Sequence, residues 1–308
     1  MSVKNIKFGL MTDKVMRNHS LKSLKGKIED KNEFLILPGV FDALSARIVE
    51  KIGFDAMFQT GYGSSASLLG LPDFGFLNAG ETIDNARRII RSVNLPVIVD
   101  IDTGYGNPLT VWRTVNDLIA YGASGVFLED QLWPKRCGHM KGKEVISSEE
   151  FLPKLKAAID ARNGHEFIIV ARTDARAPLG LDEAIERGKL YYKEGADVIF
   201  VEAPLSEEEL KEIATKIHAP LVANMIENGV TPNLSADLLQ QMGYRIAVFP
   251  LSGLYGAAYA MRKIFSDLKQ TGSTQSCRDI MMNFGEFNEL IELQKFMDMD
   301  HKYSNQAF

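Results

Sequence analysis

The chain has 308 residues, of which 45% are apolar and 24% are charged, as is ordinary for a globular protein. Its formal net charge of −5 argues against a basic face for nucleic acid or for an anionic membrane. No run reaches the ~18 apolar residues of a membrane-spanning helix. Two cysteines are too few for a disulfide scaffold, so we expect a cytoplasmic location.

Residues 1–30 are rich in lysine and have weak helical periodicity, which predicts an N-terminal arm or helix without a catalytic role. From residue 34 onward, short apolar runs rich in β-branched residues alternate with amphipathic segments of helical periodicity. The apolar runs predict strands at 34–38, 56–61, 96–102, 125–130, 167–174, 198–203, 219–225 and 246–252. The amphipathic segments predict helices at 42–52, 81–92, 108–121, 148–162, 181–194, 206–217 and 235–242, with Ser148 as a helix cap.

Apolar strands that alternate with helices indicate a parallel sheet covered on both faces. Such a series of units predicts an α/β fold, a (β/α)8 TIM-type barrel. No Gly-x-Gly-x-x-Gly follows the first strand to indicate a dinucleotide-binding sheet. Residues 257–308 predict C-terminal helices, and the last of them either seals a subunit contact or packs on its own barrel. We therefore expect 1–308 to form a single barrel domain with an extra C-terminal helical segment.

Polar residues are concentrated where the predicted strands end. Some are expected there in any fold, because strands meet water at their ends. A succession of strands that all end in this way instead predicts one active site at the C-terminal end of a barrel. These strand-end residues are Thr60, Gly61, Tyr62, Asp100, Asp102, Glu129, Asp130, Arg172, Asp174, Glu202 and Asn224.

Asp100 and Asp102 lie two residues apart on one predicted strand and therefore point the same way. Adjacent carboxylates repel each other unless a cation lies between them, and oxygen ligands suit Mg²⁺ or Mn²⁺. Glu129 and Asp73 would add a third and a fourth acid to this metal site. The structural alternatives are that Asp102 caps the following helix and that Asp73 caps a turn.

Two further strand ends offer groups for a substrate. The planar guanidinium of Arg172 can grip both oxygens of a carboxylate, although an internal salt bridge to Asp174 or Glu202 is the alternative. The backbone N–H groups around Gly61, in what we expect to be a glycine-rich turn, can bind a carboxylate or a developing oxyanion.

Cys137 is the most reactive residue that the sequence suggests. It lies in a predicted loop beside basic residues, in the segment Lys135-Arg136-Cys137-Gly138-His139. Positive neighbours lower the pKa of a thiol, so we expect an acid, a base or a nucleophile here. The glycines at 138 and 142 predict a mobile lid.

This segment resembles the signature of the isocitrate lyase/phosphoenolpyruvate mutase superfamily. The resemblance covers roughly residues 33 to 290 and extends to five other stretches. These are Gly70-Leu71-Pro72-Asp73, Asp100-Ile101-Asp102-Thr103-Gly104-Tyr105-Gly106, Leu128-Glu129-Asp130-Gln131, Ala171-Arg172-Thr173-Asp174-Ala175 and the strand that ends at Glu202.

The resemblance implies a Mg²⁺-dependent barrel that acts on small 2-oxo or 2-hydroxy carboxylates and forms a homotetramer with exchanged C-terminal helices. It implies that Cys137 donates a proton to the departing enolate. The other roles follow by position: Asp100 as metal ligand with Asp102, Asp73 and Glu129 around the cation, and Thr60, Gly61, Tyr62, Arg172, Glu202 and Asn224 around the substrate. Lys135, Arg136 and His139 belong with Cys137 to the catalytic loop.

The cysteine in this loop is typical of the carbon–carbon lyases of the superfamily. Trp133-Pro134 and the stretch at 224–232 resemble the 2,3-dimethylmalate lyase branch most closely. Thr60 and Tyr62 depart from the 2-methylisocitrate lyase pattern. We therefore expect retro-aldol cleavage of a 2-alkylmalate-type substrate to pyruvate or another 2-oxo acid plus a carboxylate.

Several alternatives stay open at this stage. The principal one is a 2-methylisocitrate lyase that releases pyruvate and succinate; lesser ones are an oxaloacetate hydrolase and a phosphonopyruvate or phosphoenolpyruvate C–P bond enzyme. A Schiff-base aldolase would need a lysine at a strand end, and a non-catalytic barrel would not need Cys137. The general base is open between Glu129, Tyr62 and a metal-bound water. A third carboxylate on the substrate would need a basic partner, which Arg136 or His139 could supply. An alkyl group on the substrate would instead prefer apolar neighbours such as Trp133, Met225 or Leu251.

Overall fold

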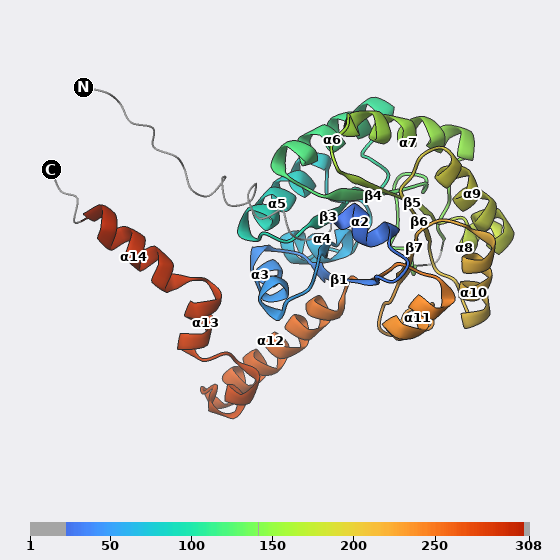
Figure 1. The fold of residues 1–308 in the computed structure, drawn as a ribbon. Helices are drawn as coiled ribbons and strands as arrows, with labels where there is room; N and C mark the ends of the chain where they lie inside the picture. Colours follow the sequence, from blue (N-terminus) through green and yellow to red (C-terminus); the bar gives the residue numbers. More distant parts are fainter. Residues whose placement is uncertain (1–22, 141, 305–308) are drawn as a thin grey trace, which may run out of the picture.

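The computed structural model describes residues 23–140 and 142–304. Within these ranges eight parallel strands pair in sequence order and close into a barrel, since β8 pairs with β1 (Figure 1). This arrangement confirms the predicted (β/α)8 fold. The strands are β1 Leu35–Val40, β2 Met57–Gln59, β3 Val97–Asp100, β4 Gly125–Glu129, β5 Ile168–Thr173, β6 Val198–Val201, β7 Leu221–Asn224 and β8 Ile246–Phe249.

Helices surround the barrel and connect consecutive strands (Figure 1). Many begin at a side chain that accepts a backbone N–H of the first turn, which satisfies one of the unpaired donors there. α7 is such a case, but its cap is Ser147 and not the predicted Ser148. The helices are α2 Leu24–Glu29, α3 Ala43–Ile52, α4 Gly61–Leu69, α5 Ala79–Ser92, α6 Pro108–Tyr121, α7 Ser148–Arg162, α8 Arg176–Leu179, α9 Leu181–Lys193, α10 Glu207–Lys216 and α11 Ala236–Met242.

The alternation of side chains along each strand separates two cores. Outward-facing residues such as Val99 and Val126 pack against the helices, whereas inward-facing residues such as Phe58 and Phe127 fill the barrel. Because side chains on a strand alternate with a period of two, the residue two positions after an inward apolar side chain also points inward. This rule places the strand-end polar residues over the barrel core: Phe58 precedes Thr60, Ile98 precedes Asp100, Phe127 precedes Glu129, Val170 precedes Arg172, Phe200 precedes Glu202 and Val222 precedes Asn224.

The two ends of the barrel differ. At the N-terminal end, Leu24 and Ile28 of α2 pack on the inner core and close it. Residues 23–30 of the predicted N-terminal arm therefore form part of the barrel, and residues 1–22 lie outside the described residues. The opposite end carries the strand-end polar residues.

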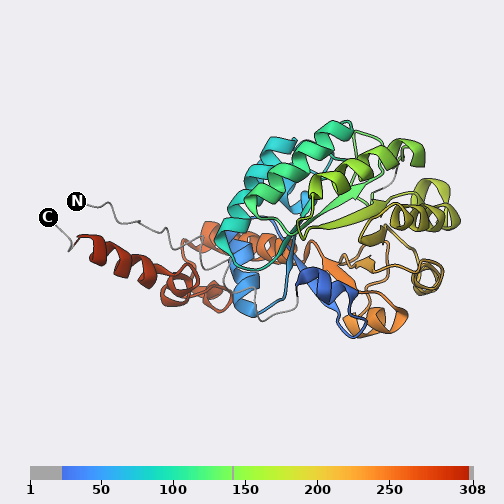
Figure 2. The same cartoon turned by 45° about the horizontal axis from the view of Figure 1, so that its top comes forward.

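A helical segment leaves the barrel after β8 and projects from it in both views (Figures 1 and 2). It consists of α12 Ser252–Thr271, η2 Gln275–Ile280, α13 Phe284–Leu290 and α14 Leu293–Ser304. This segment confirms the predicted C-terminal helices. Among the described residues, no helix combines the length and the apolar character that crossing a membrane requires.

Candidate active site

A pocket at the C-terminal end of the barrel brings together most of the predicted site residues. Its polar lining consists of Thr60, Tyr62, Asp73, Asp100, Lys135, Arg136, Cys137, Arg172, Glu202 and Asn224. Its apolar lining includes Phe58, Phe127, Phe200, Ile226, Val248, Pro250 and Leu251. Of the predicted residues, Gly61, Asp102, Glu129 and His139 lie beside the pocket and contact the residues that line it.

A buried lysine binds the acidic cluster of Asp73, Asp100 and Asp102 at the end of β3. Lys135 Nζ lies 2.5 Å from Asp73 Oδ1 and 2.7 Å from Asp102 Oδ1, and its side chain is 3% exposed. Asp100 accepts the backbone N–H groups of Gly61 and Asp102, at 3.3 and 3.1 Å. Lys135 thus joins the Cys137 loop, which we define as residues 131–147, to the loop that carries Asp73. The helix cap considered for Asp102 is made by Asn107 instead.

Burial raises the pKa values of three acids of this site, Asp100, Asp102 and Glu129. Burial raises the pKa of Asp102 to about 7; Lys135 opposes this shift, while Asp100 and Asp73 add to it. The pKa values of Asp100 and Glu129 are also raised, again chiefly by burial. Glu129 Oε1 is buried without a hydrogen-bond partner. A cation among these oxygens would relieve the repulsion.

The donors fit Mg²⁺ in type but do not form a complete cage. In residues 23–140 and 142–304, no three His, Cys, Asp or Glu side chains converge closely enough to hold a metal ion by themselves. Mg²⁺ usually keeps several waters and binds through one or two carboxylates together with the substrate. Asp100, Asp102 and the orphaned Glu129 oxygen match that mode of binding.

Arg172 forms the internal salt bridge that the sequence offered as its alternative role. Its Nε and Nη2 atoms donate to the Asp174 carboxylate at 2.8 and 3.0 Å, and Nε also lies 3.2 Å from Glu129 Oε2. The guanidinium carbon lies 5.2 Å from the centre of the Phe200 ring, a cation–π contact. Asp174 thus occupies one edge of the guanidinium and fixes its plane, and Arg172 lines the pocket.

The expected glycine-rich turn after β2 is the first turn of α4. Thr60 caps this helix by accepting the N–H of Gly63 at 3.2 Å, and Gly61 is its first residue. A helix N-terminus offers unpaired N–H groups and the positive end of the helix dipole. The predicted anion-binding role of this stretch therefore depends on a helix N-terminus. Thr60 and Tyr62 also line the pocket.

The Cys137 loop returns close to its starting strand. Gln131 and Val145 form an antiparallel bridge, and the N–H of Leu132 donates to the carbonyl of Glu144 at 2.8 Å. Cys137 lies near the far end of the loop, partly buried against the pocket. The prediction that basic neighbours lower the thiol pKa is wrong. Burial raises the pKa of Cys137 to about 11, because Lys135 points to the acids rather than to the sulfur.

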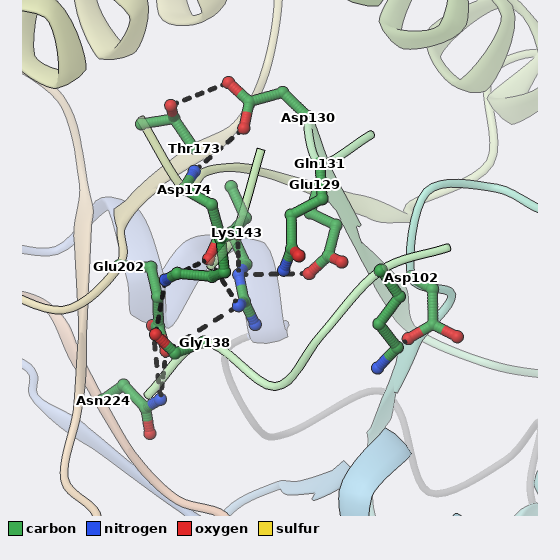
Figure 3. A network of polar contacts seen from close by, with 12 residues as sticks. Asp102, Glu129, Asp130, Gln131, Gly138, Lys143, Thr173, Asp174, Glu202 and Asn224 are labelled. Carbon is green, nitrogen blue, oxygen red and sulfur yellow. Dashed lines mark hydrogen bonds and ion pairs between the residues drawn. The ribbon is translucent and has the colours of Figure 1, made fainter. Parts of the chain in front are cut away.

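His139 is held between two elements beside the pocket. Its Nδ1 accepts the N–H of Val230 at 2.9 Å, so its Nε2 carries the proton and lies 3.5 Å from Glu202 Oε1. Burial lowers the pKa of His139, although Glu202 opposes the shift. Asn224 donates to both oxygens of Glu202 at 3.3 Å. These three side chains join β6, β7 and the Cys137 loop; Figure 3 shows Glu202 and Asn224 side by side.

Two buried residues of this site, Lys143 and Asp130, make contacts that the sequence does not predict. Lys143 donates to the Gly138 carbonyl and, at 2.8 Å, to Asp174 Oδ1. Asp130 accepts from Thr173 and from the N–H of Asp174 (Figure 3). It also accepts from Arg187 and Tyr191 of α9. Both form contacts between segments that are far apart in the chain, so local periodicity and spacing do not indicate them.

Several known proteins are similar to this chain over most of its length. The family model described as phosphoenolpyruvate phosphomutase matches residues 24–269. The petal death protein of Dianthus caryophyllus is 47% identical over 92% of this chain and 90% of its own length. The 2,3-dimethylmalate lyase of Eubacterium barkeri is 44% identical, over 88% and 94%. A 2-methylisocitrate lyase of Aeropyrum pernix is 38% identical, over 90% and 89%.

Solved structures agree with these relatives. Oxaloacetate acetylhydrolase in complex with 3,3-difluorooxalacetate has a TM-score of 0.87 at 37% identity and covers 93% of this chain and 98% of its own. A 2,3-dimethylmalate lyase has a TM-score of 0.86 at 35% identity, with 91% and 94% covered. Phosphonopyruvate hydrolase with oxalate and Mg²⁺ has a TM-score of 0.80 at 27% identity, with 91% and 97% covered. The predicted family is confirmed, and the chain belongs to the phosphoenolpyruvate mutase/isocitrate lyase superfamily.

Proposed function

We propose that the protein is a Mg²⁺-dependent carbon–carbon lyase that cleaves a 2-alkylmalate-type substrate to pyruvate or another 2-oxo acid and a carboxylate. The observation that carries this proposal is the position of Cys137. Its protonated thiol lines the same pocket as the acidic cluster and Arg172. A proton donor is therefore available where a carbanion would form.

The charges around the pocket favour a dicarboxylate over a tricarboxylate. The buried cations of the described residues here are Lys135, Lys143 and Arg172, and each is already paired with carboxylates. A third carboxylate of the substrate would meet Asp73, Asp100, Glu129 and Glu202, while Arg136, the remaining cation of the pocket wall, is exposed to water. Burying an unpaired charge is costly, so the pocket is better suited to an alkyl group than to the extra carboxylate of 2-methylisocitrate.

The apolar wall supports the same choice. Ile226, Pro250 and Leu251 line the pocket together with Cys137. Ile226 and Leu251 are 6% and 2% exposed, so a small alkyl group placed against them would lose its contact with water. Each buried methylene stabilises binding by about 0.8 kcal/mol, which gives a modest preference for alkylated malates over malate itself.

Asp100, with Asp102, Glu129 and Asp73 around it, would hold the cation, and Mn²⁺ would fit the same oxygen donors. When bound, a divalent cation stabilises negative charge on a substrate oxygen. This role predicts that Mg²⁺ raises the melting temperature of the wild type and not that of Asp100→Asn. An equal rise in both would remove Asp100 from the metal site.

The residues of the chain divide the reaction between them. The N-terminus of α4, through the N–H of Tyr62 and the helix dipole, and the guanidinium of Arg172 bind the 2-hydroxy carboxylate end. Glu129 or Tyr62 takes the proton of the hydroxyl group, and the bond between carbons 2 and 3 breaks with its electron pair left on carbon 3. The thiol of Cys137 gives its proton to carbon 3. The base then returns the hydroxyl proton through water to the Cys137 thiolate, which restores the starting state.

The test is a panel of candidate substrates assayed for 2-oxo acid release with Mg²⁺ and with EDTA. The panel contains 2,3-dimethylmalate, 2-ethylmalate, 2-methylisocitrate, isocitrate, oxaloacetate and phosphonopyruvate. We expect the fastest metal-dependent cleavage with an alkylmalate. A preference for 2-methylisocitrate would contradict the charge argument but keep the lyase class. Turnover of oxaloacetate or phosphonopyruvate alone would overturn the lyase class.

We also propose that the protein assembles as a homotetramer with exchanged C-terminal helices and is located in the cytoplasm. The assembly is supported by the exposed apolar side chains of the projecting segment, among them Tyr259, Phe265, Phe284 and Phe296. No described residue of α12 is buried, which is unusual for an amphipathic helix of this length. A second copy of the chain would cover this surface.

A further inference from the structure

Lys143 is a buried cation for which the mechanism above has no use. Its side chain is 1% exposed, and its ion-pair partner Asp174 is 0% exposed. Burying an ammonium group costs several kcal/mol unless it is well paired. Lys143 has two acceptors, the Gly138 carbonyl and Asp174 Oδ1, the latter at 2.8 Å.

Lys143 lies in the Cys137 loop, so its contacts with Gly138 and Asp174 constrain the position of that loop. Lys143 follows the far end of the loop and precedes the stretch where Glu144 and Val145 pair back to the start of the loop. Its side chain reaches across to Gly138, the residue directly after Cys137 (Figure 3). One ammonium group therefore ties the cysteine segment to the end of β5.

The anchor at the end of β5 is itself held firmly. The N–H of Asp174 donates to Asp130 at 2.9 Å, and Asp130 also accepts from Arg187 and Tyr191 of α9, both at 2.9 Å. Arg172 also donates to both oxygens of the Asp174 carboxylate, through Nε and Nη2. These contacts fix Asp174, the partner of Lys143, to the ends of β4 and β5 and to α9.

The other side of Cys137 is held by Gln131. Its Nε2 donates to the carbonyl of Arg136 at 2.8 Å, and its Oε1 accepts the N–H of the same residue at 3.0 Å. Gly138 also packs tightly: a Cβ there would lie 1.8 Å from Glu202 Oε1 and 2.5 Å from Arg172 Nη2. Cys137 is bracketed by a glutamine on one side and by the Lys143 bridge on the other.

We propose that Lys143 is a positioning residue that holds the Cys137 thiol over the pocket by joining the Gly138 carbonyl to Asp174. Lys143 does not touch the reacting atoms. It determines how much of the time the thiol lies where a carbanion can reach it. The catalytic part of this inference rests on the proposed lyase function, whereas the positioning part does not.

The experiment measures how fast iodoacetamide alkylates Cys137 in a Cys277→Ser background, by mass spectrometry of the peptide. We expect Lys143→Met to accelerate alkylation at pH 8 at least ~10-fold, because a thiol that enters water ionises near pH 8.5. The matched control is Lys154→Met, which removes a half-buried lysine that donates to the Thr103 carbonyl at 3.1 Å. The control should leave the alkylation rate unchanged, and circular dichroism verifies that each variant is folded.

Steady-state kinetics supply a second measurement. Because Lys143 affects only the placement of the proton donor, kcat should fall at least ~10-fold while KM changes less than ~3-fold. If Lys143→Met does not fold, Lys143→Gln, which can still donate to a carbonyl but lacks the charge, serves for both measurements.

The outcomes are separable. A folded variant with an unchanged alkylation rate overturns the role of Lys143, whatever the enzyme cleaves. A wild type that cleaves no compound of the panel overturns the proposed function, and the alkylation rates still decide the role of Lys143.

Discussion

Cys137 shows why neighbours in sequence are a poor guide to the electrostatics of a side chain. The adjacent basic residues predict an acidic thiol, yet Lys135 pairs with Asp73 and Asp102, and Arg136 is exposed. What remains at the sulfur is burial, which disfavours the thiolate. Of the roles expected for this thiol, an acid, a base or a nucleophile, it is therefore best suited to that of an acid. The direction in which each charged side chain points was the missing information.

The first prediction concerns this thiol. Cys137→Ser should lower kcat by on the order of 10²–10⁴, the usual value of a positioned general acid, because a hydroxyl group gives up its proton far less readily. Binding of oxalate, measured by its effect on the melting temperature, should change little. The control is Cys277→Ser, whose thiol donates to Asp267 at 3.2 Å on the projecting segment.

The pH dependence follows from the same residue. An acid must be protonated to act, and the pKa of Cys137 is raised to about 11 by burial. The contribution of Cys137 to kcat should therefore be constant from pH 7 to 9 and fall only as the pH rises toward 11. A loss of kcat between pH 7 and 9 that disappears in Cys137→Ser would contradict this assignment.

At the scale of the element, much of the site could be predicted because a strand has a period of two. Residues such as Glu129 and Glu202 follow apolar side chains that point into the barrel, so their direction could be inferred from the alternation alone. The start of α4 at Gly61 could not, because glycine and serine there favour a turn over a helix. The cap at Ser147 lies one residue from the expected position, which is the usual uncertainty of a helix boundary.

The elements β4, β5 and α9 are joined behind the site by a single carboxylate. Asp130 is 0% exposed and accepts hydrogen bonds from Thr173, Asp174, Arg187 and Tyr191. In Asp130→Asn, an amide N–H₂ would face one of these donors and the charge that pairs with Arg187 would be lost. Breaking a buried ion pair in this way costs about 3–5 kcal/mol.

This second prediction is tested by urea unfolding at a fixed protein concentration, where the midpoint should fall markedly in Asp130→Asn. The matched control is Asp117→Asn, which removes the partner of Arg113 in an exposed pair with 3.7 Å between Nε and Oδ2. Exposed pairs contribute little. Equal shifts in the two variants would show that Asp130 does not join these elements.

At the scale of the whole molecule, the barrel places its chemistry at one end and its exposed apolar surface on a segment that leaves it. The sequence predicted both parts, because strand ends and surplus helices are local features. It could not predict the contacts that join the Cys137 loop and its starting strand to β5 and α9, since Lys143–Asp174 and Asp130–Arg187 depend on the closure of the barrel. The long-range contacts that position the catalytic groups are the part that only the folded chain reveals.

The last prediction concerns the projecting segment. Phe265 on α12 and Phe296 on α14 are 62% and 53% exposed, and large apolar side chains at such exposure on two helices of one segment mark a contact surface. The double variant Phe265→Glu/Phe296→Glu should lower the molar mass measured by light scattering after gel filtration, because charges would be buried in the contact. The control, Gln270→Glu/Gln294→Glu, adds the same charge to the same two helices at exposed polar positions. It should keep the mass of the wild type, which we expect to be four chains. A monomeric wild type, or equal dissociation of both variants, would show that these aromatic side chains do not hold the assembly together.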